Sequence, residues 1–198
     1  MTMMSDNHAL ISTFLQQQVI ASLLIQEEGT ERFTKAGIVP FVRVTPRQYY
    51  VMKPGSKIPS LGEPSFQLCK GTRMHYMPGV GWRDIRESQE AMPQKERLIE
   101  TALREGIEEL GLKLENIVRL LDVGPYGFSS ATTGKSKAMW LFAAEIKAQQ
   151  DFLPAHAIAT STADRAWVTL DRFNIVGRDD HRYILKDIES KLAMYYKE

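Results

Sequence analysis

The chain has 198 residues, which fits one domain with a hydrophobic core and leaves some length for additional segments. Its 25 lysines and arginines nearly balance its 24 aspartates and glutamates, so no overall field attracts bulk nucleic acid or an anionic membrane. A single cysteine, Cys69, excludes an internal disulfide, and no apolar run reaches the roughly 18 residues of a membrane span, so we expect a cytoplasmic protein without a membrane partner.

Residues 8–28 have the pattern of an amphipathic helix. Apolar side chains recur at helical spacing from Leu10 to Leu24, and Gly29 would end the helix. Such a stripe has to be buried, either against the rest of the chain or against a second copy in a homodimer. We expect it to cover the core, and we assign residues 1–36 to an N-terminal helical extension.

Three strands are predicted next. Residues 38–45 and 49–53 are rich in β-branched and aromatic residues and are separated by a turn at 46–48, which predicts a hairpin. Residues 54–64 contain three prolines and two glycines, so we expect a loop there. The strand pattern then resumes over residues 65–70.

The segment that follows this third strand carries cations beside aromatic rings. Lys70 ends the strand, Gly71 follows it, and residues 72–92 add Arg73 and Trp82. An arginine suits a phosphate and a ring face suits a base, which favours nucleotide binding. A loop that only packs its tryptophan on the core is an equally good interpretation.

Residues 93–111 are predicted to form a helix with a buried stripe. Ile99 and Leu103 illustrate its three-to-four-residue apolar spacing. Pro93 suits the first turn, where no amide donor is needed, and Gly111 suits the left-handed position that ends a helix. Both ends of the helix are therefore marked.

The polar side of this helix holds three carboxylates at i, i+3 and i+4: Glu105, Glu108 and Glu109. Like charges at this spacing repel each other, whereas a bound divalent cation such as Mg²⁺ would make the cluster favourable. On charge alone, a solvated face with an ion-pair ladder through Glu100 and Arg104 is the simpler interpretation.

The rest of the chain alternates strands and helices. Residues 125–136 are expected to be a hairpin loop between two of these strands. The predicted elements are strands at 116–124, 137–146 and 166–170, and a final helix that Asp179 or Asp180 caps and that runs through Met194. This order predicts an α/β domain.

The residues around the carboxylate helix resemble the signature of the Nudix hydrolases. That family's box reads G-x5-E-x7-R-E-U-x-E-E-x-G-U, where U is a bulky aliphatic residue. The matching positions are Glu96, Arg104, Glu105, Glu108, Glu109, Gly111 and Leu112. Two positions depart from the pattern, because Gly106 stands where an aliphatic residue is preferred and Glu90 stands where the box glycine belongs. Gly71 is the expected substitute, with residues 72–92 inserted after it.

The resemblance implies an α/β/α sandwich with a mixed β-sheet, formed by residues 37–198 beside the N-terminal helix. It also implies hydrolysis of a pyrophosphate bond in a nucleoside diphosphate linked to another moiety X, with Mg²⁺ or Mn²⁺ as cofactor. The metal would neutralise charge on the phosphates and orient the attacking water. The expected partner is a small nucleotide-type substrate.

Roles for individual residues follow from the same resemblance. Metal ligands are expected from four carboxylates, with the first as a further ligand or a support: Glu96, Glu105, Glu108 and Glu109. Glu105, Glu108 and Arg104 would form the catalytic set, in which Arg104 pairs with Glu96 or Glu100 and so fixes the geometry of the cluster.

The proton acceptor and the substrate contacts are less defined. A helix glutamate or Asp164, ahead of the predicted last strand, would take the proton from water. The candidate substrate-binding residues are Lys70, Gly71, Arg73, Trp82 and Tyr126. The alternative function is a catalytically silent nucleotide-binding sensor, which the departures at Gly106 and at the box glycine favour.

Overall fold

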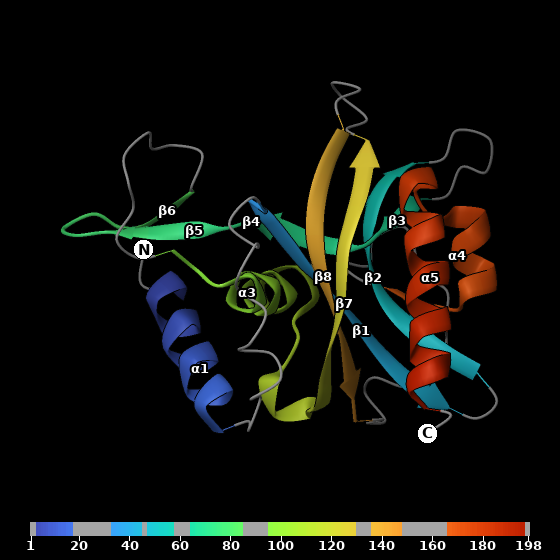
Figure 1. The fold of residues 1–198 in the computed structure, drawn as a ribbon, viewed down its shortest axis with the longest axis horizontal. Helices are drawn as coiled ribbons and strands as arrows, with labels where there is room; N and C mark the ends of the chain where they lie inside the picture. Colours follow the sequence, from blue (N-terminus) through green and yellow to red (C-terminus); the bar gives the residue numbers. More distant parts are fainter. Residues whose placement is uncertain are drawn as a thin grey trace.

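The protein folds into a β-sheet with helices on both faces. The computed structural model describes residues 3–17, 33–44, 47–57, 64–84, 95–129, 136–147 and 166–196. In Figure 1, α1 and α3 lie on one side of the sheet and α4 and α5 on the other, which is the expected α/β/α arrangement. None of the helices described is long and apolar enough to cross a membrane.

The central strand is β1 (Lys35–Val44). It pairs in parallel with β8 (Ser136–Ile146), which pairs in turn antiparallel with β7 (Ile117–Ser129). On its other edge, β1 pairs antiparallel with β2 (Arg47–Lys57) at one end and with β4 (Cys69–Thr72) at the other. The sheet is therefore mixed, and β4 leads directly to the face that α3 covers.

Four shorter strands complete the β-structure. β3 (Pro64–Gln67) and β9 (Ala166–Val168) both pair antiparallel with β2. β5 (Met74–Met77) and β6 (Gly81–Asp84) form a separate antiparallel hairpin. This hairpin is the described part of the expected insertion at 72–92, so the insertion contains regular structure.

Two predicted loops are shorter than expected. β2 continues to Lys57 and β3 begins at Pro64, so both ends of the predicted 54–64 loop are strand. β7 likewise continues to Ser129 and β8 begins at Ser136, which shortens the predicted loop at 125–136. The prolines and glycines lower local strand propensity, but pairing with the partner strand supplies the backbone hydrogen bonds.

The C-terminal elements also differ from the prediction. The predicted strand at 166–170 is shorter, and α4 (Leu170–Val176) follows it, capped by the Thr169 side chain, which accepts a hydrogen bond from the Arg172 N–H. In α5 (Asp179–Tyr195) the N-cap is Arg178, so Asp179 and Asp180 lie in the first turn. Negative charge there interacts favourably with the helix dipole.

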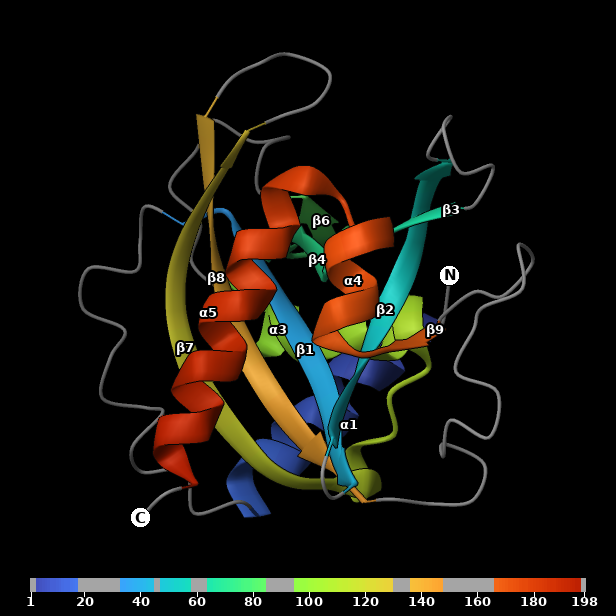
Figure 2. The ribbon, with the colours of Figure 1, turned by 90° about the vertical axis from the view of Figure 1, so that its right-hand side faces the viewer.

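The sheet has a hydrophobic core on each face. Alternate residues of β1 point to opposite sides, so that Val39 and Phe41 belong to the core under α4 and α5, whereas Ile38 and Val42 belong to the core under α3 and α1. Figure 2 shows α5 and α4 in front of the strands and α3 and α1 behind them. α3 is thus packed against the middle of the sheet.

The N-terminal helix is buried on the chain itself. α1 (Met3–Gln17) starts earlier than the predicted 8–28 segment, and the remainder of that segment lies outside the described residues. Ile11 is 1% exposed, and Phe14 and Leu15 pack against the same core as α3, whereas Leu10 is 59% exposed. The expected use of the apolar stripe to cover the core is confirmed for its described part.

The carboxylate helix is shorter at its start than predicted. α3 (Leu98–Leu110) begins after Arg97, whose backbone is extended and whose N–H donates to the Glu100 carboxylate at 2.7 Å. The helix therefore does not begin at Pro93, and Glu96 precedes it. Its end is as expected, because Gly111 has a left-handed φ of 62° and donates to the Ile107 carbonyl.

Gly106 permits a close approach of α3 to the sheet. A Cβ atom at this position would lie 2.8 Å from Cγ2 of Ile38 on β1 and 3.0 Å from Cδ2 of Leu112. Such contacts are shorter than carbon atoms tolerate, so an aliphatic side chain would push the helix away from β1. The departure from the family box at this position has a packing reason.

We expect Gly106→Ala to lower the free energy of unfolding by about 1–3 kcal/mol, even though alanine favours helix by about 1 kcal/mol. Urea denaturation measures the change. In an Ile38→Ala background, which removes Cγ2, the same substitution should instead stabilise the protein. Equal stabilisation in both backgrounds would show that the contact with β1 is unimportant.

Candidate functional site

The α3 carboxylates lie beside the end of β4. A Cβ atom at Gly71 would fall 1.8 Å from Cδ of Glu105, so the Glu105 carboxylate occupies the space that a side chain at position 71 would need. The structure thus brings Gly71 against Glu105 of the carboxylate helix. Any other residue at this position would displace Glu105.

Arg104 is the centre of the carboxylate cluster. Its side chain is 3% exposed, and Nε donates to Glu96 at 2.8 Å. Nη1 donates to Glu105 at 2.6 Å and to Glu108 at 3.0 Å, while Nη2 donates to the Thr72 carbonyl at 2.8 Å. One buried guanidinium therefore ties two carboxylates of α3 to the chain before the helix and to β4.

Glu96 is fully buried, and both of its carboxylate oxygens accept hydrogen bonds. Oε1 accepts from His8 at 2.6 Å and from Arg104 at 2.8 Å, and Oε2 accepts from the Met74 N–H and the Thr101 hydroxyl. Burial alone would raise its pKa, but the hydrogen bonds from His8 and Arg104 lower the pKa of Glu96 to about 2. With its oxygens occupied, Glu96 suits a support for Arg104 better than a metal ligand.

Glu109 is held from the sheet side. Lys53, on β2, donates from Nζ to Oε1 of Glu109. The other oxygen, Oε2, is buried and has no hydrogen-bond partner in the part of the chain that is described. Cys69 lies in the same field, because burial and then the charges of Glu109 and Glu105 raise the pKa of its thiol. A protonated, buried thiol is unreactive, so Cys69 acts here as a small strand residue.

The carboxylate oxygens of α3 are of the chemical kind that binds a divalent cation. Burial raises the pKa of Glu105, Arg104 opposes this shift, and the charges of Glu109 and Glu108 add to it, so the carboxylates are crowded. Mg²⁺ and Mn²⁺ take such oxygen ligands, and the unpartnered Oε2 of Glu109 is one oxygen available to bind a metal. Within the described residues no three acidic, histidine or cysteine side chains already converge on one point. In the structure these carboxylates contact Arg104 and Lys53.

Lys70 lies near the start of α5 and is also within the electrostatic field of Glu109. Burial, followed by the charges of Arg178 and Lys35, lowers the pKa of Lys70 to about 8, and Glu109 opposes the shift. Arg178 reaches this place because its backbone N–H donates to the Phe66 carbonyl at 2.7 Å, at the end of β3. Sequence reasoning identified Lys70 but missed three other cations: Lys35, Lys53 and Arg178. No local signal marks them, because strand pairing places Lys35 and Lys53, and the contact with β3 places Arg178.

Two predicted substrate residues of the insertion are engaged within the protein. Arg73 is 8% exposed and donates from Nε and Nη2 to the Glu96 carbonyl, at 2.8 and 2.6 Å, and from Nη1 to the Phe33 carbonyl. The Trp82 ring lies flat on His8, with ring centres 4.0 Å apart. Arg73 thus connects segments of the chain, and one face of Trp82 is covered.

The structure does not bring Tyr126 to the carboxylates. Tyr126 is 7% exposed in the core under α5, where its hydroxyl donates to Asp187 at 2.7 Å and accepts from Lys191 at 2.9 Å. This core lies on the other face of the sheet from α3. The candidate base Asp164 lies outside the described residues.

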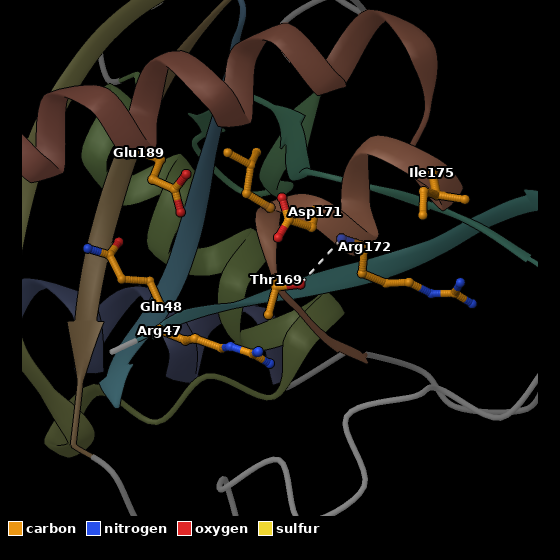
Figure 3. Close-up of a pocket in the computed structure, with 8 residues that line it drawn as sticks. Arg47, Gln48, Thr169, Asp171, Arg172, Ile175 and Glu189 are labelled. Carbon is orange, nitrogen blue, oxygen red and sulfur yellow. Dashed lines mark hydrogen bonds between the residues drawn. The ribbon is translucent and has the colours of Figure 1, made fainter. Parts of the chain in front are cut away.

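A polar pocket lies on the α4 and α5 side of the sheet, away from the carboxylate cluster (Figure 3). Its lining residues are Arg47, Gln48, Thr169, Leu170, Asp171, Arg172, Ile175 and Glu189. Two cations and two carboxylates nearly balance in charge there, and no predicted site residue contributes to it. The pocket is therefore separate from the candidate active site.

Comparisons with known proteins match this chain by fold and not by sequence. No family model and no curated protein matches the sequence. A MutT/Nudix family protein from Listeria innocua has a TM-score of 0.52 at 15% identity, and the match covers 82% of this chain and 94% of that one. For the C. elegans Ap4A hydrolase the TM-score is 0.50 at 16% identity, covering 80% of this chain and 96% of that one.

NrtR from Shewanella oneidensis gives a further match, with a TM-score of 0.51 at 14% identity that covers 81% of this chain and 63% of NrtR. The chain thus spans less than two thirds of NrtR. The Nudix domain of NrtR in complex with ADP-ribose matches with a TM-score of 0.50 at 14% identity, covering 87% of this chain and 98% of that domain. The helix, the sheet and these matches agree that the chain has the fold of the Nudix hydrolases.

Proposed function

We propose that this protein hydrolyses a pyrophosphate bond in a nucleoside diphosphate derivative and depends on Mg²⁺ or Mn²⁺. The observation that carries the proposal is the cluster in which Arg104 and Lys53 hold the three α3 carboxylates beside Gly71. Neighbours in fold support the substrate class, because one is an Ap4A hydrolase and another was solved with ADP-ribose.

In this proposal Glu105, Glu108 and Glu109 would hold the metal, and its chemistry would be to offset phosphate charge and to activate water. Arg104 keeps Glu105 and Glu108 at a fixed separation, because its guanidinium is planar and buried. Lys70 binds a phosphate oxygen beside them. Glu96 supports Arg104 and carries no proton, since its pKa is about 2.

A nucleotide-binding sensor without catalysis is the second candidate. The contact between Lys53 and Glu109 favours it, because an ammonium group already neutralises one of the expected ligands. Turnover in the presence of metal separates the two functions. Screening nucleoside triphosphates, ADP-ribose, dinucleoside polyphosphates, NADH and capped RNA with Mg²⁺ would identify the substrate.

We expect Glu109→Gln to lower kcat on the best substrate at least about 100-fold, equivalent to roughly 3 kcal/mol, because an amide supplies no charge to a divalent cation. The melting temperature should stay close to that of the wild type. Glu115→Gln, at an exposed position beyond the helix, is the matched control. A folded Glu109→Gln protein with full turnover would contradict the proposed hydrolase.

Gly71→Ala should lower kcat more than about tenfold, because the new Cβ would displace the Glu105 carboxylate from its place beside β4. The control is Gly127→Ala, where a Cβ would meet only the Lys137 carbonyl oxygen, at 4.0 Å. Steady-state kinetics on both variants measure the effect. Similar rates for the two would mean that the contact between position 71 and Glu105 has no catalytic role.

The pKa of Lys70 predicts a pH dependence of substrate binding. Its ammonium group is present below a pKa of about 8 and is lost as the pH rises through that value, so KM should increase between pH 7 and pH 9.5. Lys70→Arg should remove this increase, because arginine stays charged throughout that range. An identical pH profile of KM in both proteins would exclude Lys70 as the phosphate-binding group.

A further inference from the structure

The N-terminal helix reaches the candidate active site through one side chain. His8, on α1, is 12% exposed, and its Nε2 lies 2.6 Å from Oε1 of the fully buried Glu96. A carboxylate can only accept, so Nε2 is the donor in this contact. α1 therefore contributes a charge-assisted hydrogen bond to the carboxylate that anchors Arg104.

The β5–β6 hairpin fixes the ring of His8 from the other side. Trp82 stacks on His8 with an angle of 2° between the rings and 4.0 Å between their centres. Tyr76 packs edge-on against Trp82 at 5.7 Å, so the indole is itself held in the hairpin. Two segments outside the carboxylate helix thus converge on Glu96.

The contacts continue from Glu96 to the carboxylates of α3. Oε1 of Glu96 accepts from both His8 and Nε of Arg104, and the same guanidinium donates from Nη1 to Glu105 and Glu108. Because the guanidinium is rigid and planar, a rotation that moves Nε also moves Nη1. The orientation of Glu105 and Glu108 consequently depends on where Glu96 is held.

We propose that His8 is a positioning residue for the hydrolysis, which holds Glu96 so that Arg104 presents Glu105 and Glu108 to the metal, with Trp82 fixing the His8 ring. The inference rests on the proposed function. It also explains why a helix outside the expected domain and a hairpin inserted before the box meet at one buried carboxylate.

The hydrogen bond of His8 can be separated from the packing of α1. Ile11, Phe14 and Leu15 hold the helix against the core. Their side chains are apolar and cannot donate a hydrogen bond to Glu96, whereas His8 does. Loss of the His8 donor leaves Oε1 of Glu96 with one partner instead of two. A buried carboxylate with fewer donors is less strongly fixed in place.

The experiment compares four variants of the full chain. His8→Phe keeps a ring to stack on Trp82 but cannot donate, whereas His8→Gln keeps an N–H near the Nε2 position without the ring. Ile11→Ala weakens the packing of α1 away from Glu96 and is the matched control. Trp82→Leu removes the stacking partner without a change in α1. The readouts are kcat and KM, Mn²⁺ affinity by calorimetry, and Tm.

We expect His8→Phe to lower kcat about tenfold with KM within about twofold, and to weaken Mn²⁺ binding about threefold or more. His8→Gln should restore kcat to within about threefold of the wild type. Ile11→Ala should lower Tm and leave kcat and Mn²⁺ affinity unchanged. If His8→Phe does not fold, Trp82→Leu should still lower kcat more than Ile11→Ala does.

Wild-type kcat and Mn²⁺ affinity in His8→Phe would overturn the inference and leave the proposed hydrolase intact. Equal losses of kcat in His8→Phe and Ile11→Ala would also overturn it, because His8 would then act only by packing α1. A wild-type protein that neither binds Mn²⁺ nor hydrolyses any substrate of the screen would instead remove the proposed function, and the positioning role with it.

Discussion

The buried guanidinium of Arg104 is the constraint on which the candidate site depends. Arginine is always charged and carries five N–H donors, so burying it is costly unless carboxylates and carbonyls surround it. Here they come from three parts of the chain, namely Glu96 before the helix, Glu105 and Glu108 on it, and the carbonyl of Thr72, the last residue of β4. Satisfying one side chain therefore fixes the distance between α3 and the sheet edge.

That short distance explains the glycines of the site and the use of the additional segments. Gly106 has no room for a side chain against Ile38, and Gly71 has none against Glu105, so the helix lies close to both β1 and β4. On the Glu96 side of the cluster, α1 and the β5–β6 hairpin meet through His8 and Trp82. Extension and insertion are thus parts of one structure around the helix.

Much of the fold is predictable from local pattern, and the errors in strand length have one cause. The helix from the box, its left-handed end at Gly111 and the positions of the main strands follow from spacing and turn residues. The extents of β2 and β7 were underestimated because prolines and glycines there lower local strand propensity. Cross-strand pairing, which joins residues far apart in sequence, overrides that propensity.

For the site, the helix that carries Arg104, Glu105, Glu108 and Glu109 follows from the residue pattern, because residues at i, i+1 and i+4 to i+5 share a helical side whatever surrounds it. Which other groups meet them depends on the tertiary structure. It placed Lys53 and His8 beside the cluster and Tyr126 in the opposite core. The physical reason is that a side chain on a strand or distant helix is directed by sheet pairing and packing, and neither is encoded within a short window of sequence.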